Sequence, residues 1–144
     1  MKPSNHSRGL PHFDVGQMYY HLVFRLLSGY LSEAEIKIVK EHIISGDEKF
    51  YRLIAVQVMS NHVHVLLQPN ENTAIKSIVR GIKGVSARKI NQLRGSKGSI
   101  WSDKYFDRVI RNEKDFKKTL EYFLHNPVKA EITNNGWDYE GWEF

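Results

Sequence analysis

The stretch from His62 to Gln68 constrains the fold of this chain more than any other part of the sequence. In it, His62 and His64 alternate with Val63 and Val65, and a period of two is typical of a β-strand with one apolar face. The two imidazoles are therefore expected to point the same way, with their Cβ atoms about 7 Å apart. Such a pair can converge on one metal ion if a third ligand completes the site. The alternative is that both histidines are polar residues on the solvent face of a hairpin strand.

Composition limits the class of protein. A length of 144 residues is usual for one domain, and 21 lysines and arginines against 16 acidic residues give a net charge of +5. This excess favours a polyanionic partner such as nucleic acid. The absence of cysteine excludes disulfides, thiolate zinc sites and cysteine nucleophiles. Because neither a signal peptide nor a bilayer-spanning apolar run is visible, we expect a soluble, cytoplasmic protein.

The order of the predicted elements indicates an α+β fold. We expect strands at residues 18–27, 50–59 and 62–68 and within residues 100–112, with helices after the first, third and fourth strands. This order predicts a ferredoxin-like (βαββαβ) antiparallel sheet with an added C-terminal helix. Residues 1–17 are predicted to be a basic N-terminal arm, and residues 18–144 a single domain.

Local signals predict the ends of the first helix. Ser32 and Glu35 have the spacing of a capping box, in which each side chain bonds the backbone N–H of the other residue. Gly46 is placed to end the helix. The helix from Asn112 is expected to end near His125, because the residue before Pro127 avoids the helical region.

The second predicted helix is long and basic. Asn72 or Thr73 is expected to cap it, and Gly81 and Gly84 indicate a break or kink. Positive side chains along one side of a helix can follow a phosphate backbone, although a solvated helix face is the alternative for each of them. The candidate DNA-binding residues of this helix and of the loop that follows it are Lys76, Arg80, Lys83, Arg88, Lys89, Arg94 and Lys97.

The last helix carries the candidate chemistry. Its apolar residues at helical spacing are Phe116, Leu120, Phe123 and Leu124. At about 100° per residue, Tyr122 and Asn126 lie together on one flank of this stripe, whereas His125 points away from the core. If the helix packs beside the histidine strand, His62, His64 and Asn126 can bind Mg²⁺ or Mn²⁺.

Tyr122 would then be a catalytic nucleophile. It would attack a phosphorus polarised by the metal and form a phosphotyrosine. The alternative is a tyrosine with a buried ring and a solvated hydroxyl.

Three segments together resemble a known family. The sequences NHVHVLL, WSDKYFDRVIRN and EYFLHNPVKA resemble the single-tyrosine HUH-type transposases of bacterial insertion sequences. The leading RGLPHFDVGQMYYHLVFRL is similar to the REP-associated tyrosine transposases among their relatives. The resemblance covers about Leu10 to Ile132, and the paired histidines followed by Tyr-x-x-x-Asn-Pro-Val-Lys-Ala form a specific combination.

The resemblance implies a function. Members of the family act on single-stranded DNA next to a hairpin, and cut and rejoin it through a 5′-phosphotyrosine and a free 3′-hydroxyl. It implies that His62 and His64 are metal ligands, that Tyr122 is the nucleophile and that Asn126 is the third ligand. We therefore expect a divalent metal cofactor, Mg²⁺ or Mn²⁺, and location at the bacterial nucleoid. Both a homodimer, with or without exchange of the tyrosine helix, and a monomer occur among such proteins.

Other classes of protein remain as alternatives. A non-catalytic single-stranded nucleic-acid binding module of RRM-like fold would need neither Tyr122 nor the histidine pair, but it would present aromatic residues on its central strands. A metal-independent phosphoesterase would need a second histidine motif, which the chain lacks. A structural interaction domain would not bind single-stranded DNA.

Overall fold

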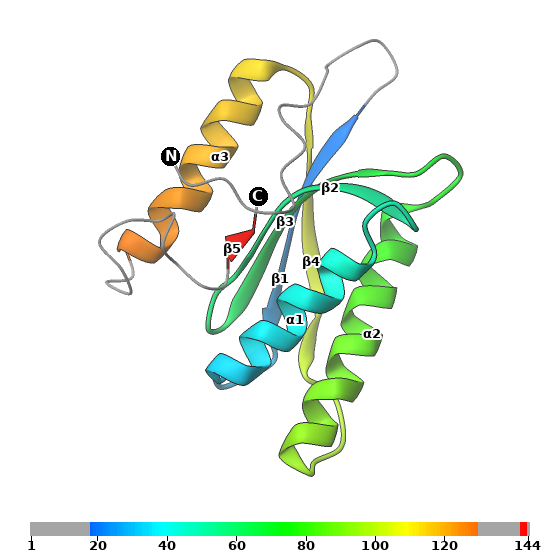
Figure 1. The fold of residues 1–144 in the computed structure, drawn as a ribbon, viewed down its shortest axis with the longest axis vertical. Coiled ribbons are helices and arrows are strands. Elements are labelled where there is room, and N and C mark those ends of the chain that lie inside the picture. The colour runs from blue at the N-terminus through cyan, green and yellow to red at the C-terminus, as the bar shows by residue number, and fades with distance from the viewer. Residues whose placement is uncertain (1–17, 130–141, 144) are drawn as a thin grey trace.

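Within residues 18–129 and 142–143, which the computed structural model describes, three helices pack on one antiparallel sheet. The strands are β1 (Tyr19–Leu26), β2 (Tyr51–Val58), β3 (His62–Pro69), β4 (Trp101–Ile110) and β5 (Trp142–Glu143). The helices are α1 (Glu33–Ser45), α2 (Ile75–Arg94) and α3 (Glu113–Lys129). The strand order β4-β1-β3-β2-β5 confirms the predicted ferredoxin-like α+β fold, to which β5 adds an edge strand that was not predicted (Figure 1).

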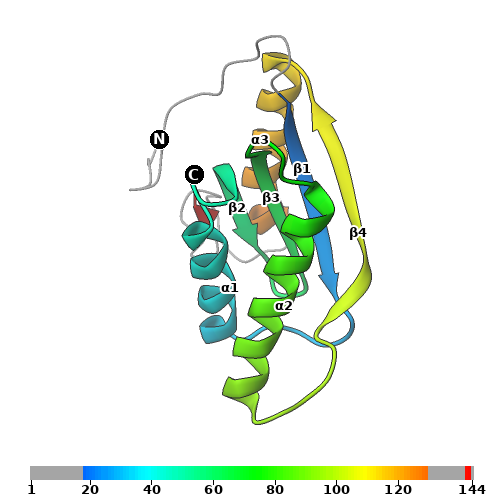
Figure 2. The same ribbon diagram turned by 90° about the vertical axis from the view of Figure 1, so that its right-hand side faces the viewer.

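The two faces of the sheet bury different side chains. On β3, Val63, Val65 and Leu67 belong to the core beneath α1 and α2, whereas Leu66 belongs to a smaller cluster beneath α3. Figure 2 shows α1 and α2 on one side of the sheet and α3 on the other. The period of two therefore correctly predicted one apolar face. The opposite face of β3 is not open to solvent, because α3 covers His64, which is only 3% exposed.

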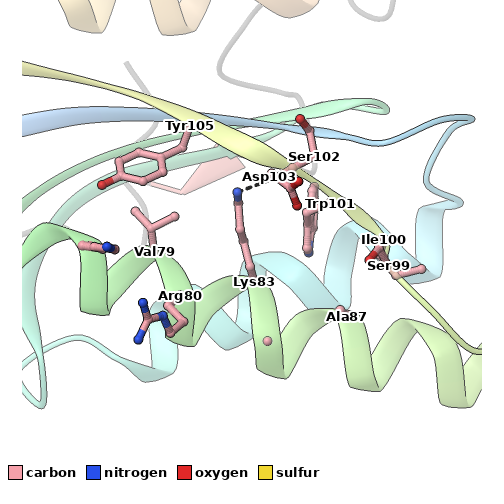
Figure 3. A pocket seen from close by; sticks show the side chains of 12 residues that line it. Val79, Arg80, Lys83, Ala87, Ser99, Ile100, Trp101, Ser102, Asp103 and Tyr105 are labelled. Atoms are coloured by element: carbon pink, nitrogen blue, oxygen red, sulfur yellow. Dashed lines mark hydrogen bonds between the residues drawn. The ribbon is translucent and has the colours of Figure 1, made fainter.

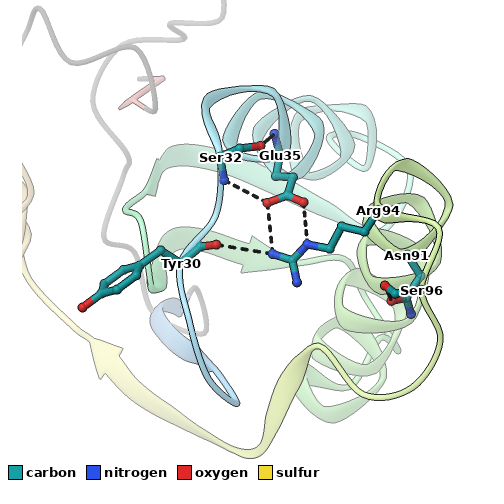
Figure 4. Close-up of polar contacts among 6 residues, drawn as sticks. All are labelled: Tyr30, Ser32, Glu35, Asn91, Arg94 and Ser96. Carbon is teal, nitrogen blue, oxygen red and sulfur yellow. Dashed lines mark hydrogen bonds and ion pairs between the residues drawn. The ribbon is translucent and has the colours of Figure 1, made fainter.

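Helix α1 begins and ends at the predicted residues. Glu35 N donates to Ser32 Oγ, Ser32 N donates to Glu35 Oε1, and Gly46 is the C-cap. Glu35 also accepts hydrogen bonds from Nε and Nη2 of Arg94 at 2.6 and 3.0 Å (Figure 4). Arg94 Nη2 also donates to the Tyr30 carbonyl. The guanidinium lowers the pKa of Glu35, so this pair links the end of α2 to the start of α1.

Helix α2 differs from its prediction in two respects. It is continuous through Gly81 and Gly84, and its N-cap is Ala74, without a side-chain capping bond. The predicted break is wrong because Ile78, before the two glycines, and Ile90, after them, are both buried in the same core. Glycine weakens a helix by about 1 kcal/mol, which packing overrides.

Helix α3 is longer than predicted. Asn112 caps it as expected, since Asp115 N donates to Asn112 Oδ1 at 2.8 Å. The helix continues through Pro127 to Lys129, so the predicted end near His125 is wrong. Phe116 and Phe123 are fully buried, as the apolar stripe predicted.

Some predictions concern residues outside the described part of the chain. The basic arm at residues 1–17 is one of them. In the described ranges, no helix is both long and apolar enough to cross a membrane.

Candidate active site

The histidine strand is held at the centre of the sheet. Strand β3 lies between β1 and β2, and Met59 N donates to the His62 carbonyl at 2.8 Å to close the turn at Ser60 and Asn61. Because β3 is paired on both sides, its backbone cannot shift without breaking two ladders. The positions of His62 and His64 are therefore fixed by the register of three strands.

His64 forms a buried pair with a histidine of β1. The distance between His21 Nε2 and His64 Nδ1 is 2.9 Å, the ring centroids lie 5.1 Å apart, and the rings are stacked. The register aligns His64 with Val23, which makes His21 a diagonal neighbour on the same face of the sheet. A hydrogen bond between two imidazoles needs one nitrogen with a proton and one without.

Burial keeps this pair neutral. It lowers the pKa of His21 to about 4, with a smaller effect of Arg108, and it lowers the pKa of His64 to about 2. Desolvation penalises the charged form of a histidine, and the two neighbouring rings oppose double protonation. At neutral pH, both rings are therefore neutral, which is the form that binds a metal ion.

His62 is held in a different way. It is half-buried, and its Nδ1 lies 2.7 Å from Asn61 Oδ1, an atom that can only accept. His62 Nδ1 must therefore donate, which leaves its unprotonated nitrogen at Nε2. Burial also lowers the pKa of His62, with a smaller effect of Arg25.

The two imidazoles fit a metal site. Since Nδ1 of each ring is used in a hydrogen bond, Nε2 is the nitrogen with which each would ligate a metal. The ring centroids of His62 and His64 are 4.9 Å apart. No group of three or more His, Cys, Asp and Glu side chains that could hold a metal occurs in the described residues. Among the described residues, a third protein ligand would therefore be of another type, and Asn126, the predicted third ligand, has a side chain outside the described part.

Tyr122 lies directly beside the buried histidines. Its ring centroid is 5.4 Å from that of His64 and 6.4 Å from that of His21, in edge-on arrangements, and the residue is 52% exposed. The phenol is thus both close to the histidines and accessible to a large substrate. On the helix, Asn126 lies about one turn beyond Tyr122, whereas His125 is exposed, as predicted.

A buried amide anchors α3 beside this site. Gln57 on β2 is fully buried, and its Nε2 donates to the carbonyl of Phe123. In a regular helix, that carbonyl would accept from the N–H of residue 127, but Pro127 has none. Gln57 thus supplies the donor that Pro127 lacks, which explains how α3 continues through the proline. Since Phe123 follows Tyr122, the same bond fixes the position of the tyrosine.

Strand β4 holds the first half of α3. Arg108 donates to Asp115 Oδ1 and to Thr119 Oγ1, both at 2.8 Å. Thr119 is only 2% exposed, so the second bond is shielded from water. These contacts fix the angle at which α3 crosses the sheet.

The predicted basic helix borders a separate groove. Between α2 and β4 lies a cavity of about 420 Å³, and Lys76, Arg80 and Lys83 line its helical side. Lys83 Nζ donates to the carbonyl of Ser102 and lies 5.8 Å from the ring centroid of Tyr105 (Figure 3). It also donates to the carbonyl of Lys104. The side chains of Lys76 and Arg80 are exposed, and Lys83 is half-buried.

The other predicted DNA-binding residues do not line this groove. Arg88 and Lys89 contribute to lowering the pKa of His42 on α1, so they lie towards that helix. Lys97 is exposed in the loop after α2. Arg94 forms the ion pair with Glu35, which gives this candidate a structural partner.

Two important residues were missed by the sequence analysis. His21 could have been recognised in the same way as His62 and His64, because it is also a polar residue in a strand with alternating apolar residues. Gln57 has only the weaker signal of a buried amide in an apolar strand, and its role depends on the approach of α3.

Comparison with known proteins relates the sequence and the fold to transposases. The family model described as transposase IS200 like matches residues 14–126. The chain therefore belongs to the IS200-like transposase family. Among curated proteins, a candidate REP-associated tyrosine transposase of Haemophilus influenzae is 26% identical over 89 residues, covering 55% of this chain and 51% of the relative. The ISDra2 transposase TnpA of Deinococcus radiodurans is 28% identical over 105 residues, covering 63% and 71%.

Solved structures share the fold. A REP-associated tyrosine transposase bound to a REP hairpin superposes with a TM-score of 0.68 at 21% identity, covering 93% of this chain and 80% of that one. A crystal structure of a candidate transposase from Deinococcus radiodurans gives 0.52 at 22% identity, covering 80% and 95%.

Proposed function

We infer that this protein is a metal-dependent DNA strand transferase that cleaves and rejoins single-stranded DNA through Tyr122. The observation that carries this proposal is the position of Tyr122. Its phenol is accessible, and its ring centroid lies 5.4 Å from that of the buried, neutral His64. Membership of a transposase family supports the proposal.

The reaction is an exchange of phosphodiester bonds. Tyr122 Oη forms a bond to the scissile phosphorus as the bond to the 3′-oxygen breaks, and the phenolic proton is transferred, in net terms, to that oxygen. The products are a 5′-phosphotyrosine and a free 3′-hydroxyl. Attack by another 3′-hydroxyl reverses the step and joins two strands. Because the phosphotyrosine retains the energy of the broken bond, no nucleotide hydrolysis is needed.

His62, His64 and Asn126 would hold the metal ion. When bound, Mg²⁺ or Mn²⁺ would polarise the scissile phosphate and neutralise its charge. Ligation of His64 through Nε2 requires its Nδ1 to donate to His21 Nε2, so His21 is proposed to set the tautomer and orientation of His64. Asn61 does the same for His62.

We propose that the substrate carries a hairpin. The structural relative is bound to a REP hairpin, and the groove between α2 and β4 offers Lys76, Arg80 and Lys83 to a phosphate backbone. The ring centroids of Tyr122 and His64 of the same chain lie 5.4 Å apart, so the tyrosine reaches the histidines without a partner, and we propose cleavage in cis. Such an enzyme would work in the cytoplasm, at the nucleoid.

A denaturing gel tests the proposal. The protein is mixed with hairpin-containing single strands from the flanks of its own gene, with Mg²⁺, Mn²⁺ or EDTA. We expect a covalent adduct that requires metal, is lost in Tyr122→Phe while DNA binding is retained, and persists in the control Tyr105→Phe. In His64→Ala, metal affinity and cleavage should fall together. Binding without any adduct, in both metals and with several flanks, would favour the non-catalytic binding module.

A further inference from the structure

Phe106 is an exposed aromatic residue on the same face of the sheet as the candidate active site. It lies within β4 opposite Val23 of β1, and it is 58% exposed. Two residues along the strand, Arg108 stands opposite His21, so alternation puts Phe106 on the histidine face. Helix α3 covers His21 but not this end of the face.

Phe106 and Tyr122 line one cleft. The cleft has a volume of about 700 Å³ and is bounded at one end by His21, His64 and Tyr122. Towards its other end lie Arg25, Lys104 and Phe106. A volume between about 300 and 1,000 Å³ is usual for pockets that hold small molecules, so a nucleotide fits beside the tyrosine.

The charge of the cleft suits a nucleic-acid strand. Arg25 and Lys104 are exposed, and no aspartate or glutamate is among the described residues that line the cleft. Asp107, the neighbour of Phe106, is on the opposite face of β4, paired in register with Leu22. Arg25 stands opposite His62, so its positive charge lies beside the candidate metal site.

We propose that the single strand next to the scissile phosphate runs along this cleft, with one nucleobase stacked on Phe106 and its phosphates at Arg25 and Lys104. This site deepens the proposed function and rests on it. In a duplex, each base is covered by its neighbours, whereas an unpaired base offers its face to an aromatic ring. The cleft is therefore specific for an unpaired segment, in contrast to the basic groove between α2 and β4.

Affinity measurements in a protein without the nucleophile test the site. A dye-labelled single strand of mixed sequence is titrated into Tyr122→Phe protein, and fluorescence anisotropy is recorded. Adding Phe106→Ala should weaken binding about 5- to 150-fold, the usual effect of losing one stacked base. Phe50→Ala is the matched control, because Phe50 is 57% exposed and borders the groove between α1 and α2. It should leave the affinity unchanged.

Two further measurements sharpen the test. Arg25→Gln and Lys104→Gln should each reduce the slope of log affinity against log salt by about 0.7. Phe106→Leu, which retains an apolar side chain, should lose affinity like Phe106→Ala. Equal affinity of the Phe106 variants and their parent, or an equal loss in Phe50→Ala, would overturn the proposal.

Failure of this proposal is distinct from failure of the proposed function. The affinity comparison involves no chemistry, so it decides the role of Phe106 even if wild-type protein forms no adduct. Conversely, an adduct with unchanged affinity in the Phe106 variants would retain the nucleophile and reject the stacking site.

Discussion

The two faces of the sheet differ in what holds them together. The face beneath α1 and α2 is a continuous apolar core that includes Leu22, Val65 and Leu67. The face beneath α3 has a smaller apolar cluster, and buried polar groups such as His21 and Gln57 lie beside it. The face beneath α1 and α2 also has buried hydrogen bonds, such as the one from Trp101 Nε1 to Ser86 Oγ, but the buried polar groups of the other face lie at the candidate site.

This difference indicates a division of labour. A buried polar group that loses its partner costs about 1–3 kcal/mol, so a face rich in such groups is sensitive to small changes. The same groups orient the side chains of the candidate site. We therefore infer that the face beneath α1 and α2 mainly stabilises the fold, whereas the buried polar groups beneath α3 position Tyr122 beside the histidines.

Replacement of two adjacent leucines tests the roles of the two faces separately. Leu67 and Leu66 are both fully buried, in the cores on opposite faces. Leu67→Ala and Leu66→Ala should each destabilise the protein by about 2–5 kcal/mol in urea unfolding. At a temperature where both variants remain folded, only Leu66→Ala should slow formation of the covalent DNA adduct, because it loosens the packing between the sheet and α3. Equal rates would remove the distinction between the faces.

The histidine pair predicts acid sensitivity. Burial lowers the pKa values of His21 and His64 to about 4 and about 2, so below about pH 6.5 the unfolded chain binds more protons than the folded one. With EDTA present to remove metal ions, the free energy of unfolding should be highest above pH 6.5 and fall on acidification towards pH 4. The expected loss is on the order of 1 kcal/mol per pH unit from each histidine.

Replacement of one histidine provides the control. His21→Gln should be less stable at pH 7 but depend less steeply on pH, because one of the histidines whose pKa is lowered by burial is removed while His64 and His62 remain. Urea unfolding between pH 7 and 5 measures this slope. An unchanged slope would mean that the pair is not neutral in the folded protein.

A double-mutant cycle examines the anchor of α3. Gln57→Leu should cost about 1–3 kcal/mol, because the carbonyl of Phe123 loses its donor. In a Pro127→Ala background, residue 127 regains an N–H, and the same substitution should cost less. Equal costs in both backgrounds would show that the amide does not compensate for the proline.

The smallest effect concerns the continuous helix α2. A Cβ atom at Gly81 would have open space, so Gly81→Ala should raise the free energy of unfolding by about 0.5–1 kcal/mol. Gly95→Ala is the contrasting control, since Gly95 has φ of 66° and alanine there is strained. Stabilisation by both substitutions would contradict this reading.

Local patterns predicted the fold well. The strand periodicity, the capping box at Ser32 and the cap at Asn112 are properties of a few neighbouring residues, and the structure confirms each. Tertiary contacts overrode two other local rules. Packing kept α2 continuous through its glycines, and Gln57 allowed α3 to pass Pro127.

The candidate site was only partly predictable. The sequence predicted that His62, His64 and Tyr122 lie near one another, and the structure brings the three together. It did not predict the pairing of His21 with His64, because that contact depends on β1 lying beside β3 in one register. Phe106 escaped notice because its exposure depends on how much of the sheet α3 covers.

The most direct measurement is to identify the amino acid that becomes attached to DNA. Wild-type protein is reacted with a hairpin-containing single strand and metal, digested with nuclease and protease, and the peptides are analysed by mass spectrometry. The account predicts a nucleotide phosphate on Tyr122 and none on Tyr105, which borders the same cleft. Attachment at Tyr105, or at any residue away from the histidine face, would contradict it.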